Sequence, residues 1–367
     1  MQNRRADMLR VDFINVGDGD SILVRYRPPG ARKRSEEYVM LVDCGRPAVA
    51  HSGDSRRMEA SAYLSRAGID HIDLLLLTHL HFDHIGGAPA ILRRFPVRAL
   101  LAGYYPPPAA RRVVPPVEGQ KTITGLYGAL NLFADIVSQA EQQGASRLTA
   151  LPVSFAPAPG LEVTVHRPVP LLSLRQQALF DRIYHGLPCT ETELYEASKG
   201  RNCTSLIVRL CYAGVSVLLT GDAYAACWED AEEAPCDILK LPHHGDAKSM
   251  TEPLLRRLSP RYAVISCQND SPKRKERPAN AVTELLLRHV PHVLCTENRP
   301  MPGLRAASHD AVRFVVDAHG HIRCPEARQL RPGGPPPAAS FPICCRTADG
   351  IHPKEPSAKK RNRREPL

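Results

Sequence analysis

The chain has 367 residues, of which 43% are hydrophobic, so it can form one large globular domain with appendages or two smaller domains. Its formal net charge of +10 favours polyanionic partners such as nucleic acid or anionic lipid, although a basic protein with a charged tail has the same composition. The longest apolar stretch, residues 72–77, is far too short to cross a bilayer, which excludes a membrane-spanning protein.

The cysteines and the first residues bear on the cellular compartment. There are eleven cysteines, an odd number, and no pair has CxxC spacing. The first ten residues are polar and basic, without the apolar core of a signal peptide. The sequence therefore predicts reduced, mostly buried thiols and a cytoplasmic location.

The N-terminal half alternates strand and helix patterns. Two strands with a Gly-Asp turn are expected over residues 9–26, and a third over 38–42. The elements expected after them are a helix over 56–67, a strand over 72–77, a helix over 88–94, a Pro-rich irregular segment over 104–117, a helix over 124–143, a strand over 161–165, and an insertion of helix and loop over about 171–200.

The second half repeats this alternation. It should begin with a hairpin, formed by strands 206–211 and 215–219 around a Tyr-Ala-Gly turn. The later elements expected are strands over 237–241, 262–266, 292–295 and 312–317, and helices over 250–258 and 279–289. Strands and helices that recur in two halves predict a layered α/β sandwich.

The composition changes near residue 326. Residues 333–339 are rich in proline, and residues 359–364 form a basic run. Such a segment cannot bury much apolar surface. We therefore expect one domain over residues 1–325 and a disordered tail over 326–367.

A dense cluster of metal-ligand side chains follows the apolar strand 72–77. It comprises His79, His81, Asp83 and His84. Imidazole nitrogen and carboxylate oxygen are ligands for zinc and similar divalent ions, whereas solvated loop histidines have no reason to gather in this way. The spacing predicts that His79 and His81 turn toward one ion and that Asp83 and His84 reach a second.

Two more distant motifs complete this set. Asp222 comes directly after the apolar strand 215–219, and His243 and His244 follow the strand 237–241. Either motif alone is weak, because Thr-Gly-Asp is a common turn. Strand ends that meet at one edge of a sandwich are, however, a natural place for ligands to converge.

These residues together resemble the metallo-β-lactamase superfamily, and more narrowly the hydrolase domain of ComEC-type competence proteins. The resemblance covers about residues 8–320, without the membrane channel of those proteins. The stretches that carry it are residues 13–20, 41–45, the histidine cluster with Gly86-Gly87, 202–222 and 237–245. The resemblance implies a four-layer αββα sandwich and a hydrolase.

The resemblance also implies roles for single residues. The carboxylate that matches Asp43 orients the metal loop through hydrogen bonds, and the one that matches Asp222 bridges two metal ions. His244 completes the second ion, because it forms the family's usual His-Gly step. His243 is then left to orient a ligand or to contact substrate.

The chain departs from the superfamily at one metal ligand. Many members have a further histidine midway along the chain, where this sequence has Asn202, as in the ComEC branch. The first ion then has only His79, His81 and Asp222, with the amide of Asn202 as an additional ligand or a substrate contact. Two Zn²⁺ ions are expected, with Mn²⁺ as the alternative.

The expected reaction is hydrolysis of a phosphodiester in DNA or RNA by a hydroxide held between the two ions, with Asp83 and Asp222 as its positioning carboxylates. Lys273 and Arg277, in a basic loop, are candidate contacts to a polyanionic backbone, and Arg277 stands where relatives often have histidine. Two alternatives stay open. One is a phosphodiesterase for a small nucleotide or choline phosphate ester, and the other is a non-catalytic nucleic-acid-binding module.

Overall fold

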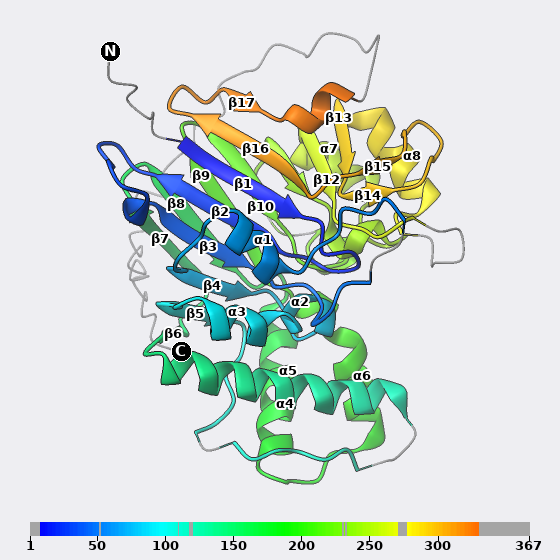
Figure 1. Cartoon of the computed structure of the whole chain (residues 1–367). Helices are drawn as coiled ribbons and strands as arrows, with labels where there is room; N and C mark the ends of the chain where they lie inside the picture. The colour runs from blue at the N-terminus through cyan, green and yellow to red at the C-terminus, as the bar shows by residue number, and fades with distance from the viewer. Residues whose placement is uncertain are drawn as a thin grey trace, which may run out of the picture.

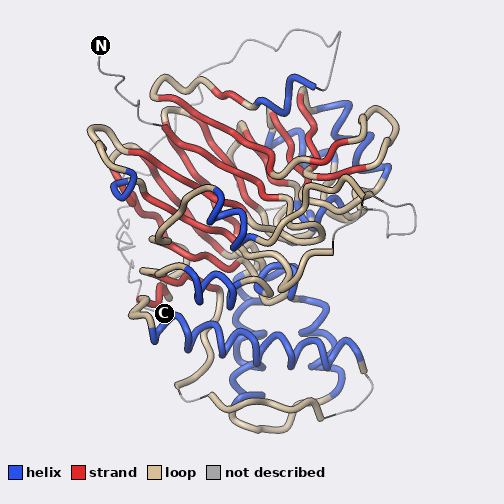
Figure 2. The backbone as a smooth tube through the Cα atoms, in the orientation of Figure 1, coloured by secondary structure: helices blue, strands red, loops and turns tan. Residues whose placement is uncertain are grey.

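The computed structural model describes residues 8–50, 53–108, 110–116, 120–229, 231, 233–270 and 277–329. Two large β-sheets lie face to face, and helices cover their outer surfaces (Figures 1 and 2). This is the four-layer αββα sandwich that the sequence predicts. Among the described residues, no helix combines the length and the apolar character needed to cross a bilayer.

The first sheet comes mainly from the N-terminal half. Within the described residues it has the strand order β17-β16-β1-β2-β3-β4-β5-β6. Its strands are β1 (Met8–Ile14), β2 (Ile22–Arg27), β3 (Tyr38–Val42), β4 (Leu74–Leu77), β5 (Ala99–Ala102), β6 (Ser146–Leu148), β16 (Ala311–Asp317) and β17 (Ile322–Arg323). β1 pairs antiparallel with β16 along its whole length, so the last part of the fold closes on the first.

The second sheet follows in the chain, with the order β13-β12-β11-β10-β9-β8-β7 among described residues. Its strands are β7 (Val153–Ala158), β8 (Leu161–His166), β9 (Ile207–Tyr212), β10 (Val215–Leu219), β11 (Ile238–Lys240), β12 (Tyr262–Ile265) and β13 (His292–Cys295). β10, β11 and β12 are parallel, so their carboxyl ends share one edge. The short strands β14 (Glu297–Asn298) and β15 (Ala307–Ser308) pair separately.

The helices surround this sandwich. The α-helices are α1 (Ala60–Arg66), α2 (Phe82–Ile85), α3 (Ala88–Arg94), α4 (Lys121–Gln142), α5 (Pro170–Tyr184), α6 (Glu191–Gly200), α7 (Glu252–Leu258) and α8 (Asn280–His289). The 3-10 turns are η1 (Arg34–Glu36), η2 (Asn202–Thr204), η3 (Ala225–Cys227), η4 (Pro242–Gly245) and η5 (Pro325–Gln329). α4, α5 and α6 form a helical lobe below the sheets (Figure 1).

Three apolar cores hold the layers together. The central core joins the two sheets, with side chains such as Phe13 and Phe314 meeting Val217 and Val264. A second core packs α1, α3, α4, α5 and α6 on the outer face of the first sheet. A third packs α7 and α8 on the second sheet. The described fold extends to η5, and from residue 330 onward the tail expected over 326–367 lies outside the described residues.

Candidate metal centre

The predicted ligands come from three strand ends at one edge of the sandwich. β4 ends at Leu77 and leads through His79 to His81, the residue before α2. Asp222 follows β10, and His244 lies in η4 after β11. The structure therefore brings together side chains that lie far apart in the sequence.

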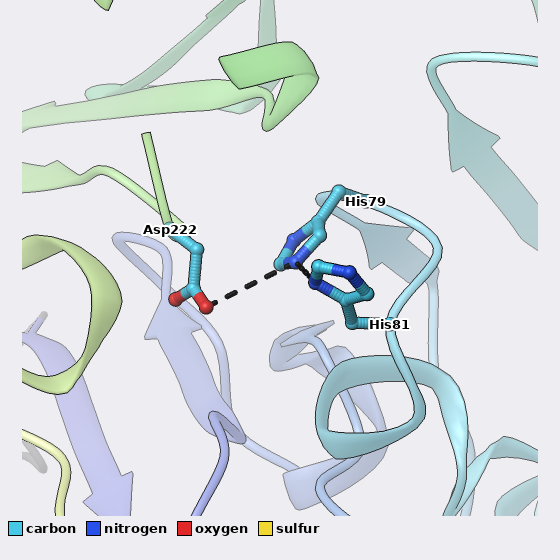
Figure 3. Close-up of side chains that lie close together, drawn as sticks. All are labelled: His79, His81 and Asp222. Carbon is cyan, nitrogen blue, oxygen red and sulfur yellow. Dashed lines mark hydrogen bonds and ion pairs between the residues drawn. The ribbon is translucent and has the colours of Figure 1, made fainter. Parts of the chain in front are cut away.

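One group of possible metal ligands is His79, His81 and Asp222 (Figure 3). His79 Nε2 lies 2.8 Å from His81 Nδ1 and 3.9 Å from Asp222 Oδ2. His79 and Asp222 are almost fully buried. Two imidazoles and one carboxylate that face a common point are suited to hold a divalent ion.

A second group comprises Asp83, His84 and His244. Asp222 Oδ2 lies 3.2 Å from His84 Nε2 and 3.5 Å from His244 Nε2. His244 Nε2 lies 3.9 Å from Asp83 Oδ2. One oxygen of Asp222, Oδ2, therefore lies near imidazole nitrogens of both groups.

Hydrogen bonds fix the orientation of these rings. Asp43 accepts hydrogen bonds from the backbone N–H and the hydroxyl of Thr78, at 2.8 and 2.7 Å, and contacts His84 Nδ1 at 2.7 Å. His244 Nδ1 lies 2.9 Å from the carbonyl oxygen of Ser266. A ring that donates through Nδ1 leaves Nε2 as the free ligand atom. In both histidines Nε2 faces Asp222.

The first group favours neutral imidazoles. Burial, with His84 and His81 nearby, holds the pKa of His79 well below its usual value. Burial and the Arg201 guanidinium lower the pKa of His81 to about 3. Neutral imidazole is the form that binds metal ions. Arg201, which donates to the carbonyl oxygen of Leu80 at 2.7 Å, was not predicted as part of the site.

The second group stabilises positive charge. Burial favours the neutral form of His84, but Asp222 and Asp43 outweigh it and hold the pKa of His84 well above its usual value. The pKa of His244 is raised against burial by Asp222. Burial favours the protonated form of Asp222, yet His244 and His84 hold its pKa well below the usual range. Carboxylates that stabilise an imidazolium would equally stabilise a bound cation.

Unsatisfied polar atoms show that the site is built for a further group. Among the described residues, Nε2 of His84 and Nε2 of His244 are buried without a hydrogen bond of good geometry, and both face Asp222 Oδ2. Buried polar atoms are normally hydrogen-bonded, and leaving them unpaired is costly. These are the atoms that would coordinate metal, so the donor set fits divalent ions.

Sequence reasoning missed two charged residues beneath the site, Asp20 and Lys240. Asp20 Oδ2 lies 3.8 Å from His84 Nδ1, and with His84 and Asp222 it forms a third possible ligand group. The Lys240 ammonium is fully buried, forms an ion pair with Asp20, and lies 3.7 Å from Asp222 Oδ1. Gly19 allows this approach, because a Cβ there would lie 2.2 Å from the carbonyl oxygen of Asp83.

The predicted substrate contacts are only partly brought together. Asn202 Nδ2 lies 3.2 Å from His243 Nε2 and donates to the Tyr224 hydroxyl at 3.0 Å. Arg277 lies nearby, with Nε 3.7 Å from Asp246 Oδ2. Asn202 Oδ1 is buried without a hydrogen bond, so an acceptor stays available there. Lys273 lies outside the described residues.

Unusual backbone conformation is concentrated at this site. Asp43, His243 and His244 have φ values of 58°, 47° and 56°. Such left-handed conformations cost free energy in residues with a Cβ and persist where the surroundings enforce them. The strain places both histidines of η4 at the edge where β10 and β11 end.

The prediction that the thiols are reduced is wrong for one pair. Cys203 and Cys227 form a disulfide across 24 residues, with their Cα atoms 5.6 Å apart. The physical reason is that η2 and η3 lie side by side beside the site, at a separation that a disulfide can span. Burial raises the pKa of the free thiols of Cys44 and Cys236.

Comparison with known proteins places this geometry in context. Residues 15–160 match the family model described as the metallo-beta-lactamase superfamily. The chain is also 25% identical over 303 residues to ComE operon protein 3 of Bacillus subtilis (strain 168), a match that covers 78% of this chain and 32% of that protein. The chain thus spans about a third of that relative's length.

Two solved structures are similar at lower identity. The metallo-beta-lactamase fold protein YhfI from Bacillus subtilis is 12% identical, with 78% of this chain and 95% of that chain covered and a TM-score of 0.40. Zn²⁺-bound PqqB from Methylobacterium extorquens is 15% identical, with 80% and 86% covered and a TM-score of 0.36.

Proposed function

We propose that this chain, which carries a metallo-beta-lactamase superfamily domain and has the fold of metal-dependent hydrolases, cleaves phosphodiester bonds in nucleic acid at a centre for two divalent ions. The observation that carries the proposal is the position of Asp222. Its carboxylate lies within 3.2 to 3.9 Å of imidazole nitrogens from both ligand groups. Two ions that share a carboxylate are a recurring arrangement in enzymes that hydrolyse phosphate esters.

Each group would hold one ion. His79, His81 and Asp222 would hold the first, and Asp83, His84, His244 and Asp222 the second. When bound, such ions supply a hydrolytic nucleophile at neutral pH and neutralise the charge that develops on a phosphoryl group. The protein's own part is to fix the rings through Asp43 and to keep the first pair of imidazoles neutral.

The donor set favours zinc, because imidazole nitrogens predominate. Manganese is the alternative for the first ion, since that group has two histidines and a carboxylate, and Asn202 stands nearby with an amide oxygen free to coordinate. Oxygen donors suit Mn²⁺. Elemental analysis of the purified protein distinguishes the two.

Cations near the ligands support an anionic substrate. Arg46 Nη2 lies 3.8 Å from Asp83 Oδ2, and its side chain is 47% exposed. Arg277 lies close to His243 and Asp246 with its side chain partly exposed. Guanidinium groups at the rim of a metal site can hold the phosphates of a nucleic-acid backbone. The similarity to ComE operon protein 3 agrees with a substrate of this kind.

The test is cleavage of single-stranded DNA, duplex DNA, RNA and bis(p-nitrophenyl) phosphate with Zn²⁺ or Mn²⁺. We expect His81→Ala and Asp222→Ala to abolish polymer cleavage, and His185→Ala, at the exposed residue that directly follows α5, to leave it unchanged. Cleavage of the small ester alone would shift the assignment to a small-molecule phosphodiesterase. Tight DNA binding without bound metal or cleavage would leave a binding module.

A further inference from the structure

A cavity of about 620 Å³ lies on the outer face of the first sheet, away from the metal ligands. Its lining residues come from β1, β2, β16, α1 and the segment around η1. Met8 and Arg10, at the start of β1, line it, whereas Asp20, beneath the metal ligands, follows the other end of that strand. The cavity and the metal centre are therefore separate sites.

Arginines dominate the lining of this cavity. The strand pleat sends Leu9 and Val11 into the central core, so Arg10 faces outward, directly opposite Arg25 on β2. The arginines of the lining are Arg10, Arg25, Arg27, Arg34, Arg66 and Arg313. Only two carboxylates, Glu37 and Asp310, line the cavity with them.

The acidic residues nearby do not neutralise all of these cations. Asp12 accepts from Arg10 at 2.7 Å, Glu37 pairs with Arg27, Asp310 pairs with Arg66 and Arg313, and Glu326 also pairs with Arg313. The Arg34 guanidinium contacts a backbone carbonyl oxygen, that of Ala67. Two cations, Arg25 and Arg34, thus have no carboxylate partner among the described residues.

Arg25 is the strongest sign of a missing anion. Its Nε is buried without a hydrogen bond, and the side chain is only partly exposed. Burial and the neighbouring Arg10 lower the pKa of Arg25 and outweigh the opposing effect of the Asp12 and Glu37 carboxylates. A guanidinium in this position costs stability unless an anion completes the site.

We infer that this cavity binds the phosphate groups of a small polyphosphorylated molecule, of about the size of a nucleoside triphosphate. Guanidinium groups match phosphate oxygens in planar, paired hydrogen bonds. The cavity volume lies in the range of small-molecule sites. Its lining is confined to twelve residues, which favours a compact ligand over a continuous strand. The inference does not depend on the proposed nuclease activity.

The test is calorimetric titration of the full metal-loaded chain with inorganic triphosphate at constant ionic strength. We expect binding by the wild type and a loss of roughly ten-fold or more in affinity for Arg25→Gln and for Arg34→Gln. Two matched controls should keep the wild-type affinity. They are Asp222→Asn in the metal centre and Arg261→Gln, a surface arginine outside the cavity.

Other outcomes would overturn the inference. Equal affinity in Arg25→Gln and wild type, or loss of binding only in Asp222→Asn, would assign the triphosphate to the metal centre. Binding of single-stranded DNA that depends on Arg25, with no binding of triphosphate, would make the cavity a strand-binding surface instead. Thermal unfolding of the ligand-free variants checks folding, and Arg25→Gln should melt no lower than wild type because it relieves repulsion.

Discussion

Asp43 directly follows β3 and connects this strand end to the end of β4, which leads into the histidine cluster. It accepts from the backbone and side chain of Thr78 and contacts His84 Nδ1. A carboxylate in this position sets both the tautomer and the direction of the ring. The energetic role of Asp43 is therefore to make Nε2 of His84 available before any metal binds.

We predict that Asp43→Asn lowers metal affinity by about 10- to 100-fold while the protein stays folded. The physical reason is that an amide stabilises the metal-binding orientation of His84 less well. Competition with a chromophoric chelator measures the affinity. The matched control is Asp73→Asn. The Asp73 carboxylate also accepts a hydrogen bond from a backbone N–H on a neighbouring strand, that of Val39 on β3, but it lies at the start of β4, away from the histidines. Equal affinities in both variants would contradict this role.

Lys240 is a buried cation that lies close to two buried carboxylates, those of Asp20 and Asp222. Its ammonium pairs with Asp20, lies 3.7 Å from Asp222 Oδ1, and donates to the Gly221 carbonyl oxygen at 2.7 Å. We predict that Lys240→Met lowers the free energy of unfolding by about 3 kcal/mol, because Asp20 is left as an uncompensated buried charge. Urea unfolding in EDTA measures this without a contribution from metal.

The double variant Lys240→Met/Asp20→Asn is the internal control for that prediction. Removing both charges should recover more than half of the lost stability, because no unpaired charge stays buried. If the loss of stability in the double variant equals the sum of the losses in Lys240→Met and in Asp20→Asn, Lys240 and Asp20 are not coupled.

The sequence reveals the histidine cluster because its members are neighbours in the chain, but it hides Asp20 and Lys240. Lys240 stands between two leucines and resembles an ordinary outward side chain of a strand. The alternation nevertheless places it on the same face as Ile238, which packs in the central core. Only the pairing of the two sheets shows that this face is buried at the site.

At the scale of elements, the sequence predicts the long helices and most strands of the two sheets, but it misses three strands in the middle of the chain. The helix expected over 88–94 matches α3, and the helix expected over 124–143 begins three residues earlier, at Lys121. β5, β6 and β7 were not predicted. β5 is four residues long and gains its strand form from parallel partners on both sides, which is a tertiary effect.

Glu233 connects the loop before β11 to the neighbouring strands β8 and β9. Its carboxylate lies 2.9 Å from His166 Nε2 on β8 and accepts from Arg209 on β9 at 2.8 Å. Burial alone would raise the pKa of Glu233, but hydrogen bonds from His166 and Arg209 lower it overall. A lowered pKa in the folded state means that ionised Glu233 stabilises the fold.

We therefore predict that Glu233→Gln costs about 2 kcal/mol of unfolding free energy near neutral pH. A carboxylate with a lowered pKa contributes fully above its ordinary value of 4.5, and the contribution is lost as the pH falls further. The difference between wild type and variant should thus be constant down to about that pH and shrink below it. Urea unfolding across the acid range is the measurement, with exposed Glu162→Gln on β8 as the control. A difference that does not change with pH would contradict the ionic role.

At the scale of the whole molecule, the chain closes on itself. β16 completes the first sheet by pairing with β1, and Phe314 packs against Phe13 with ring centroids 5.9 Å apart. Residues of the N-terminal half and of the C-terminal half thus share one core, while the metal ligands come from both. The site cannot form in either half alone.

The last turn, η5, fixes the C-terminal limit of the fold. Glu326 is only 6% exposed. Its carboxylate accepts hydrogen bonds from Arg313 Nη1 at 2.9 Å and from the backbone N–H of Arg313 at 3.2 Å, and these bonds anchor the turn to β16. A chain that ends at Cys324 loses this anchor, whereas one that ends at Gln329 keeps it. The boundary expected from the sequence lies at residue 325, because the composition changes near residue 326 and the segment beyond it contains a Pro-rich stretch and a basic run.

We predict that the chain ending at Gln329 unfolds within about 1 kcal/mol of the full chain and binds the same amount of metal, because the described fold is complete at that point. The chain ending at Cys324 should lose about 2 kcal/mol, the contribution of a charge-assisted hydrogen-bonded pair that is partly buried. Glu326→Gln in the full chain separates the loss of the pair from the loss of length. If all three variants unfold like the full chain, η5 is not part of the cooperative unit and the fold ends with β17.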